Sequence, residues 1–151
     1  MRAGAATILV VLLAAAGCGG GDSGLSKSDF IAKADGICKK TTPPSTPTPK
    51  TASDAKKAAQ AQVDYRVPIQ AELGKLDPPD EVKADFDKFQ TATQKSIDDF
   101  KQQVEAAAKN QESRYGTLNR KIDGLFKQRQ QLANKIGFKF CGQPVAPAKK
   151  K

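Results

Sequence analysis

Residues 82–107, VKADFDKFQTATQKSIDDFKQQVEAA, decide the fold. Within this stretch a set of mostly apolar residues recurs every three or four positions: Val82, Phe86, Phe89, Thr93, Ile97, Phe100, Val104 and Ala107. Because an α-helix makes one turn in about 3.6 residues, that spacing places the whole set on one face. No segment of the chain has the sustained alternation of a strand. The sequence therefore predicts an all-α fold whose longest helix begins near residue 80.

A helix is also predicted ahead of this stretch, from a cap at Thr51 or Ser53 to about Leu76. Pro68 lies inside it and is expected to kink it, because proline cannot donate the helical hydrogen bond. Its expected inward positions are Ala55, Ala59, Val63, Val67, Leu73 and Leu76. Residues 77–80, Asp-Pro-Pro-Asp, then predict a turn in which an Asp caps the next helix and a Pro occupies its first position.

Another long helix is predicted after residues 82–107, beginning beyond a break at Asn110 or nearer Gly116. Its expected inward positions are Tyr115, Leu118, Ile122, Leu125, Arg129, Leu132 and Ile136. Gly137 is a natural end for it, because glycine readily adopts the left-handed conformation that terminates many helices. Three long helices with short connections favour an antiparallel three-helix unit.

A shorter helix is predicted near the start, with Ser26 as its cap and Asp29 three residues further on. Its inward face would hold Phe30, Ile31, Ala34, Ile37 and Cys38. It should end near Lys40 or Thr41, because the proline-rich residues 42–50 favour an extended polyproline spacer. That spacer is expected to run along most of the bundle.

The first 18 residues have the organisation of a bacterial export signal. Arg2 supplies a positive charge, and residues 3–16 form an apolar segment that is shorter than the ~20 residues of a membrane-spanning helix. The residues before Cys18 resemble the lipobox of bacterial lipoproteins, in which the cysteine is lipidated, for example with palmitate, and becomes the mature N-terminus. Ordinary secretion with cleavage after Ala16 is the alternative. The predicted organisation is a signal peptide at 1–17, a lipidated Cys18 with a flexible tether at 18–25, a helical domain at 26–142 and a basic disordered tail at 143–151.

The cysteine count fits this organisation. The chain has three cysteines, and if Cys18 carries lipid, Cys38 and Cys141 remain as an even pair. Outside the cytoplasm such a pair is expected to form a disulfide. The bond would join the end of the first helix to the end of the last, and it would staple a small core that has no tryptophan.

The composition excludes several classes of function. The 151-residue chain has a formal charge of +9, which near a membrane favours anionic neighbours but which also simply serves solubility. Its lysines and arginines are spread out without a stacking or groove-reading element, so nucleic-acid binding is not expected. The chain has no histidine, and it therefore lacks the usual general base and the commonest zinc ligand. We expect no catalytic residue, no cofactor and no bound metal.

Two charged residues remain as candidates for a special role. Arg129 falls on an otherwise apolar face, where it would anchor an anionic ligand or extend to water beside Phe126 and Ala133. Asp35 lies close to the expected disulfide, where it would face water or cap a neighbouring backbone segment.

Other acidic groups are expected to be solvated. Asp98 and Asp99, like Asp85 and Asp87, point in different directions on a helix and do not converge as a catalytic carboxylate pair must. The Gly-Asp-Ser-Gly sequence at 21–24 resembles a serine-protease motif, but that chemistry needs a histidine that the chain lacks.

Three short motifs resemble a set of small, uncharacterised actinobacterial lipoproteins: Phe30-x3-Ala34-Asp35-x-Ile37-Cys38, Leu73-x2-Leu76 before Pro78-Pro79, and Gly137-Phe138-x2-Cys141-Gly142. The resemblance spans residues 25–142 and implies a helical extracytoplasmic domain with its two cysteines paired. It supplies no activity, ligand or catalytic residue. The chain departs from the pattern in its higher content of lysine and glutamine.

Together these features predict a non-enzymatic module, lipid-anchored at the extracytoplasmic face of the cell membrane, that binds or spaces a partner. That partner would be an envelope protein, an anionic cell-wall polymer or a small ligand. The alternative is a substrate-capture or sensor lipoprotein that holds an apolar ligand between helices, in a cavity lined by Phe86, Phe89 and Phe100. A closed bundle filled with phenylalanine would argue against that alternative.

Overall fold

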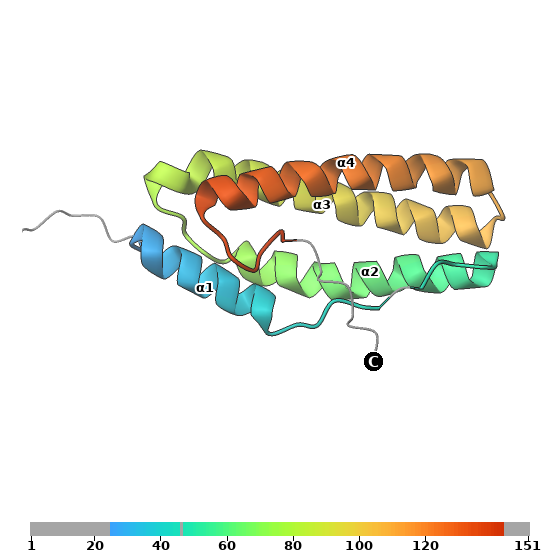
Figure 1. Cartoon of the computed structure of the whole chain (residues 1–151), viewed down its shortest axis with the longest axis horizontal. Helices are drawn as coiled ribbons and strands as arrows, with labels where there is room; N and C mark the ends of the chain where they lie inside the picture. The colour runs from blue at the N-terminus through green and yellow to red at the C-terminus, as the bar shows by residue number, and fades with distance from the viewer. Residues whose placement is uncertain (1–24, 46, 144–151) are drawn as a thin grey trace, which may run out of the picture.

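A computed structural model describes residues 25–45 and 47–143, and within them all regular structure is helical. The helices are α1 (Lys27–Lys39), α2 (Ala52–Leu73), α3 (Asp80–Ala108) and α4 (Glu112–Ile136). Figure 1 shows α2, α3 and α4 side by side, each antiparallel to the next along the chain, with α1 lying beside the end of α2. The predicted all-α bundle, an antiparallel three-helix unit with a short N-terminal helix, is confirmed.

The membrane-related predictions fall largely outside the described residues. The predicted signal at 1–17, Cys18 with the tether up to residue 24, and the tail from residue 144 all lie outside them. Among the helices of residues 25–45 and 47–143, none has the length and apolarity needed to cross a bilayer. Lipid attachment at Cys18 therefore stays a prediction.

α3 is the central helix and packs against α2 on one side and α4 on the other. Its predicted apolar face is buried, except that Val104 is only half-buried. Contact on two sides also buries residues outside that face: Ala92, Ser96, Asp99, Gln103 and Ala106. Gln103 is accommodated because its side-chain amide donates a hydrogen bond to the side chain of Asn119 on α4. α3 therefore buries side chains on two sides, whereas the spacing predicted burial on only one face.

Several helix ends follow the predicted local chemistry. The Ser26 hydroxyl accepts a hydrogen bond from the backbone of Asp29 and caps α1. Thr51, rather than Ser53, caps α2, because it exchanges hydrogen bonds with Asp54 in a capping box. The break before α4 lies at Asn110, whose φ of 52° is left-handed. Gly137 ends α4 with a φ of 102°, a conformation that favours glycine.

Two predicted boundaries were wrong. α2 ends at Leu73 rather than Leu76, because Gly74 is its C-cap and the next residues form a turn in which Leu76 N–H donates to the carbonyl of Leu73. The predicted start of α3 with an Asp cap followed by Pro is also incorrect. Pro79 itself is the N-cap, without a side-chain hydrogen bond, and Asp80 is the first helical residue. Carboxylates in this first turn favour the positive end of the helix dipole.

The inward face of α2 differs from the prediction at its centre. α2 continues as one helix through Pro68, and Ala59, Val63 and Leu73 are buried as expected. Val67, however, is 43% exposed and does not point into the bundle. The helical register that buries Val63 turns Arg66 toward the interior instead.

Phenylalanines fill the bundle where α1 meets the segment that follows α4. Phe30 of α1, Phe86 and Phe89 of α3, and Phe138 beyond α4 are buried in one cluster. The rings of Phe30 and Phe86 meet edge to face with centroids 4.9 Å apart, and those of Phe89 and Phe138 meet at 5.6 Å. Such pairs add about 0.5–1.5 kcal/mol each beyond burial of their apolar area. This cluster fixes α1 and the segment after α4 against the helices.

A disulfide and a buried carboxylate hold the segment that follows α4. Cys38 and Cys141 are bonded, with their Cα atoms 5.3 Å apart, so the predicted pairing is confirmed. Asp35 is buried and accepts backbone hydrogen bonds from Lys139 at 2.8 Å, Phe140 at 2.9 Å and Cys141 at 3.1 Å. Of its two predicted roles, Asp35 therefore has the backbone-capping one. The proline-rich spacer leads from α1 along α2 to the far end of the bundle (Figure 1).

Candidate functional site

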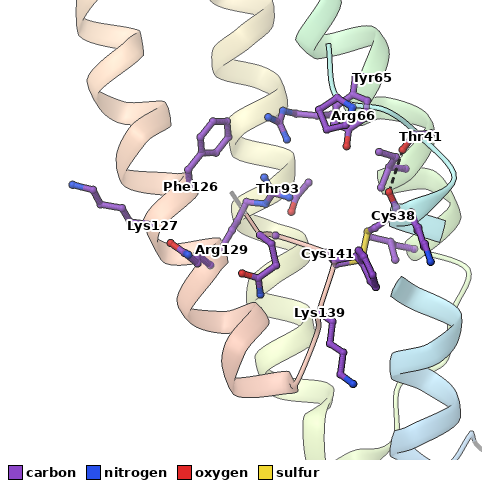
Figure 2. A pocket seen from close by; sticks show the side chains of 18 residues that line it. Cys38, Thr41, Tyr65, Arg66, Thr93, Phe126, Lys127, Arg129, Lys139 and Cys141 are labelled. Atoms are coloured by element: carbon purple, nitrogen blue, oxygen red, sulfur yellow. Dashed lines mark hydrogen bonds between the residues drawn. A yellow bond between two sulfur atoms is a disulfide. The ribbon is translucent and has the colours of Figure 1, made fainter. Parts of the chain in front are cut away.

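A cavity of about 620 Å³ lies between α2 and α4, two helices that both pack on α3. The end of α1, the start of the spacer, Thr93 of α3 and the segment after α4 border it as well, so six parts of the chain contribute to its wall. The volume is within the range of small-molecule sites, about 300–1,000 Å³. Its wall combines charged and apolar side chains, and Figure 2 shows its lining.

Arg66 of α2 is the first of two arginines in this cavity. Its guanidinium carbon lies 4.6 Å from the ring centroid of Phe126 and 5.4 Å from that of Phe100. One terminal nitrogen donates a hydrogen bond to the side chain of Gln62 at 2.9 Å. Its Nε atom is buried and has no hydrogen-bond partner. Arg66 is thus held in place by aromatic rings while part of its donor capacity is unused.

Arg129 of α4 is the second. Its guanidinium carbon lies 5.2 Å from the ring centroid of Phe89 and 5.8 Å from that of Phe126. Its Nε atom, like that of Arg66, is buried without a hydrogen-bond partner. Figure 2 shows both arginine side chains directed into the space between the helices. Arg129 is thus half-buried and lies beside Phe126, and its side chain is directed into the cavity.

The two arginines form an uncompensated pair of positive charges. Burial lowers the pKa of both Arg66 and Arg129 to about 10, and for Arg129 the nearby charge of Arg66 contributes to the lowering. Both groups remain charged at neutral pH. No Asp or Glu carboxylate of the described residues lies at ion-pair distance from either guanidinium. Both side chains are half-buried in the cavity wall, and no described carboxylate neutralises them there, so an anion that enters the cavity would meet two unpaired positive charges.

The rest of the charged lining has the same sign. Lys39, Lys127 and Lys139 border the cavity, and no acidic residue is among its described lining. Lys39 lies over the ring of Phe140 at 5.1 Å, beside the opening. Figure 2 shows Lys127 and Lys139 extending away from the two arginines. These exposed lysines raise the local positive potential without filling the interior.

An apolar wall completes the cavity. Ile69 and Leu73 of α2, the Cys38–Cys141 disulfide and the rings of Tyr65 and Phe126 contribute to it. The Thr93 hydroxyl is buried at its floor and donates to the carbonyl of Phe89 at 2.8 Å. The cavity thus offers one strongly cationic region and one apolar surface, which together suit an amphipathic anion.

The sequence-predicted apolar cavity is not the one that the structure contains. Phe86 and Phe89 are packed in the phenylalanine cluster, Phe100 packs with Val63 and Ile122, and none of the three lines the cavity. These three phenylalanines fill the interior of the bundle instead of lining a cavity between helices.

The acidic candidates lie elsewhere. Asp85 forms an ion pair with Lys135 at 3.0 Å, and Asp87 is exposed. Asp98 is exposed as predicted, but Asp99 is largely buried beside Lys121, because α3 contacts α4 on that side. None of these carboxylates borders the cavity that holds the two arginines.

Arg66 is the site residue that sequence reasoning missed. The signal was present, because Ala59, Val63, Arg66 and Leu73 follow helical spacing as well as the set that includes Val67. Because Val67 is apolar and Arg66 is charged, the pattern favoured Val67 as the inward residue.

Similarity to other proteins supplies no function for this cavity. The resemblance to actinobacterial lipoproteins stays a prediction that rests on short motifs. Comparisons with protein families, with curated proteins and with solved structures give no match.

Proposed function

We propose that the mature protein is a non-enzymatic, lipid-anchored binding module at the outer face of the cell membrane, and that its cavity binds a small anionic ligand. One observation carries the ligand assignment: Arg66 and Arg129 converge on the cavity with no described carboxylate to neutralise them. The positively charged rim is compatible with the anionic partner expected from the composition.

Energetics favour a ligand over a structural role for this pair. A buried donor without a partner costs about 1–3 kcal/mol, and well-packed apolar residues in place of buried charges are often neutral or stabilising. The aromatic rings around Arg66 and Arg129 offset part of the cost, but they leave the Nε donors unsatisfied. An anion would satisfy those donors and remove the repulsion between the two charges.

The available groups suit binding better than catalysis. Guanidinium, hydroxyl and amide groups of Arg66, Arg129, Thr93 and Gln130 line the cavity. General acid–base catalysis near neutral pH usually relies on histidine or a carboxylate, and the chain has no histidine. A charged and partly apolar lining also favours an anionic ligand over the purely apolar ligand of the alternative prediction.

Anion binding is expected to stabilise the protein through its two arginines. With 1-naphthalenesulfonate, 1-naphthoate or 1-naphthyl phosphate as the probe, an anion that binds should raise the free energy of unfolding by about 1.4 kcal/mol at ten times its Kd. The double variant Arg66→Gln/Arg129→Gln should lose that gain. Arg120→Gln, an exposed arginine of α4 outside the cavity, is the matched control and should retain it. Equal stabilisation of all three proteins, or of none, would count against the proposal.

Membrane attachment is expected to depend on Cys18. Cys18→Ser should move the protein from the membrane fraction to the soluble fraction or block its processing, because the serine cannot carry the thioether-linked lipid. Fractionation followed by immunoblotting measures this, with Cys38→Ser/Cys141→Ser as the control that leaves Cys18 intact. Unchanged membrane retention of Cys18→Ser would contradict the anchor without affecting the assignment of the cavity.

A further inference from the structure

The geometry points to a ligand class for this cavity: we infer that it binds a phosphate monoester, with the phosphate between Arg66 and Arg129 and an apolar organic group against Tyr65, Ile69 and Leu73. The inference rests on the proposed anion-binding function and makes it more specific. It requires that one small group contact both arginines, that two charges be neutralised, and that room remain for an organic part.

The two arginines are placed to contact one group. They come from different helices, α2 and α4, yet both guanidinium carbons lie close to the ring of Phe126, at 4.6 Å and 5.8 Å from its centroid. Both guanidiniums therefore lie beside the same ring, and both arginines border the same open space (Figure 2). An anion in that space can accept hydrogen bonds from both helices.

Charge and oxygen count favour phosphate over carboxylate. A carboxylate has two oxygens, and a single guanidinium fork can occupy both. Two guanidiniums offer more donors and two charges, which matches a phosphate monoester with three terminal oxygens and a charge near −2. The described lining has no carboxylate to repel such a dianion, and Lys39 and Lys139 add to the attraction at the opening.

The cavity is larger than a phosphate group alone requires. Its volume of about 620 Å³ leaves space beside the arginines, and that space is bounded by Ile69, Leu73 and the ring of Tyr65. Burying apolar groups there gains about 25 cal/mol for each Å² removed from water. The organic part of the ligand is therefore apolar, either an aromatic ring or an alkyl chain such as that of a lipid phosphate.

Calorimetric titration of the chain without its predicted signal and Cys18, residues 19–151, with three naphthyl anions tests the inference. At pH 8, 1-naphthyl phosphate is a dianion with three terminal oxygens, 1-naphthalenesulfonate a monoanion with three, and 1-naphthoate a monoanion with two. We expect the phosphate to bind at least about tenfold more tightly than either monoanion. We also expect this preference to shrink at pH 5, where the phosphate takes up a proton, since its second pKa is about 6.

Variants assign the binding to the two arginines. Arg66→Gln and Arg129→Gln are each expected to weaken 1-naphthyl phosphate binding by about 10- to 100-fold, the range for losing hydrogen bonds to a charged group. Arg66→Lys should recover only part of the loss, because an ammonium lacks the guanidinium fork. Arg120→Gln removes the same charge outside the cavity and should change affinity less than about twofold. Thermal unfolding of each variant verifies that it is folded.

The outcomes separate this inference from the proposed function. Octyl phosphate binding more tightly than 1-naphthyl phosphate would identify a lipid-like ligand, and the reverse order an aromatic one; both support a phosphate monoester. Equal affinity for all three naphthyl anions, lost on Arg66→Gln, would overturn the phosphate assignment and leave anion binding intact. If none of these anions binds, or if binding is unaffected by both arginine variants, the inference and the proposed function are both wrong.

Discussion

Replacing Cys38 and Cys141 with alanine is expected to lower the free energy of unfolding by about 4 kcal/mol. The disulfide joins residues 103 positions apart, so it closes nearly the whole described chain into one loop and restricts the unfolded state. It also ties α1, which otherwise makes only limited contact with α2, to the segment after α4. For a small domain this is a large share of a total stability of about 5–15 kcal/mol.

Urea denaturation followed by circular dichroism measures this change. The wild-type protein under reducing conditions serves as the control, because it loses the bond without losing any side-chain volume. Both proteins should unfold at a similar, lower urea concentration than the oxidised wild type. A loss below about 1 kcal/mol would mean that the phenylalanine cluster alone holds α1 against the segment after α4. The same variant should also bind anions more weakly, since the disulfide forms part of the cavity wall.

Asp35→Asn is expected to cost about 3 kcal/mol of stability. The Asp35 carboxylate accepts three backbone hydrogen bonds from residues 139–141, and a hydrogen bond to a charged group contributes about 1.5–3 kcal/mol, although such contributions do not add fully. An asparagine offers only one acceptor oxygen, and its amide group would face backbone donors. The turn that carries Lys139 and Cys141 to the cavity would therefore be loosened.

The comparison with Asp123→Asn isolates this effect. Asp123 is an exposed carboxylate of α4, and its replacement removes the same charge without breaking a buried contact, so a change within about 0.5 kcal/mol is expected. Hydrogen exchange should show faster exchange of the amides of residues 139–141 in Asp35→Asn alone. Equal stability of the two variants would show that Asp35 does not hold this segment.

The helices were predictable because their signals are local. The spacing of apolar residues in 82–107 specifies a helix whatever surrounds it, and Asn110 and Gly137 mark helix ends through their own backbone preferences. The errors arose where tertiary contact decides. Pro79 caps α3 without a side-chain bond, and Gln103 is buried because α3 has a neighbour on each side.

Only one of the two arginines of the candidate site could be identified from the sequence. Arg129 stood out as a charge on an apolar face, but its direction depends on the rings of Phe89 and Phe126, which come from two helices. Arg66 was not identified because the adjacent Val67 fits the apolar pattern equally well. The convergence of the two arginines follows from the separation of α2 and α4 across α3, which no local spacing encodes.

The Nε–H resonances of the two arginines provide the most direct test of anion binding in the cavity. In ¹⁵N-labelled protein, the Nε–H resonances of Arg66 and Arg129 can be followed during a titration with 1-naphthyl phosphate, with the exposed Arg120 as an internal reference. Because no protein atom of the described residues accepts a hydrogen bond from either Nε, we predict that their two resonances shift together and saturate with one Kd, while that of Arg120 stays in place. Unchanged resonances of Arg66 and Arg129 at saturating anion would contradict the assignment of this cavity as an anion-binding site.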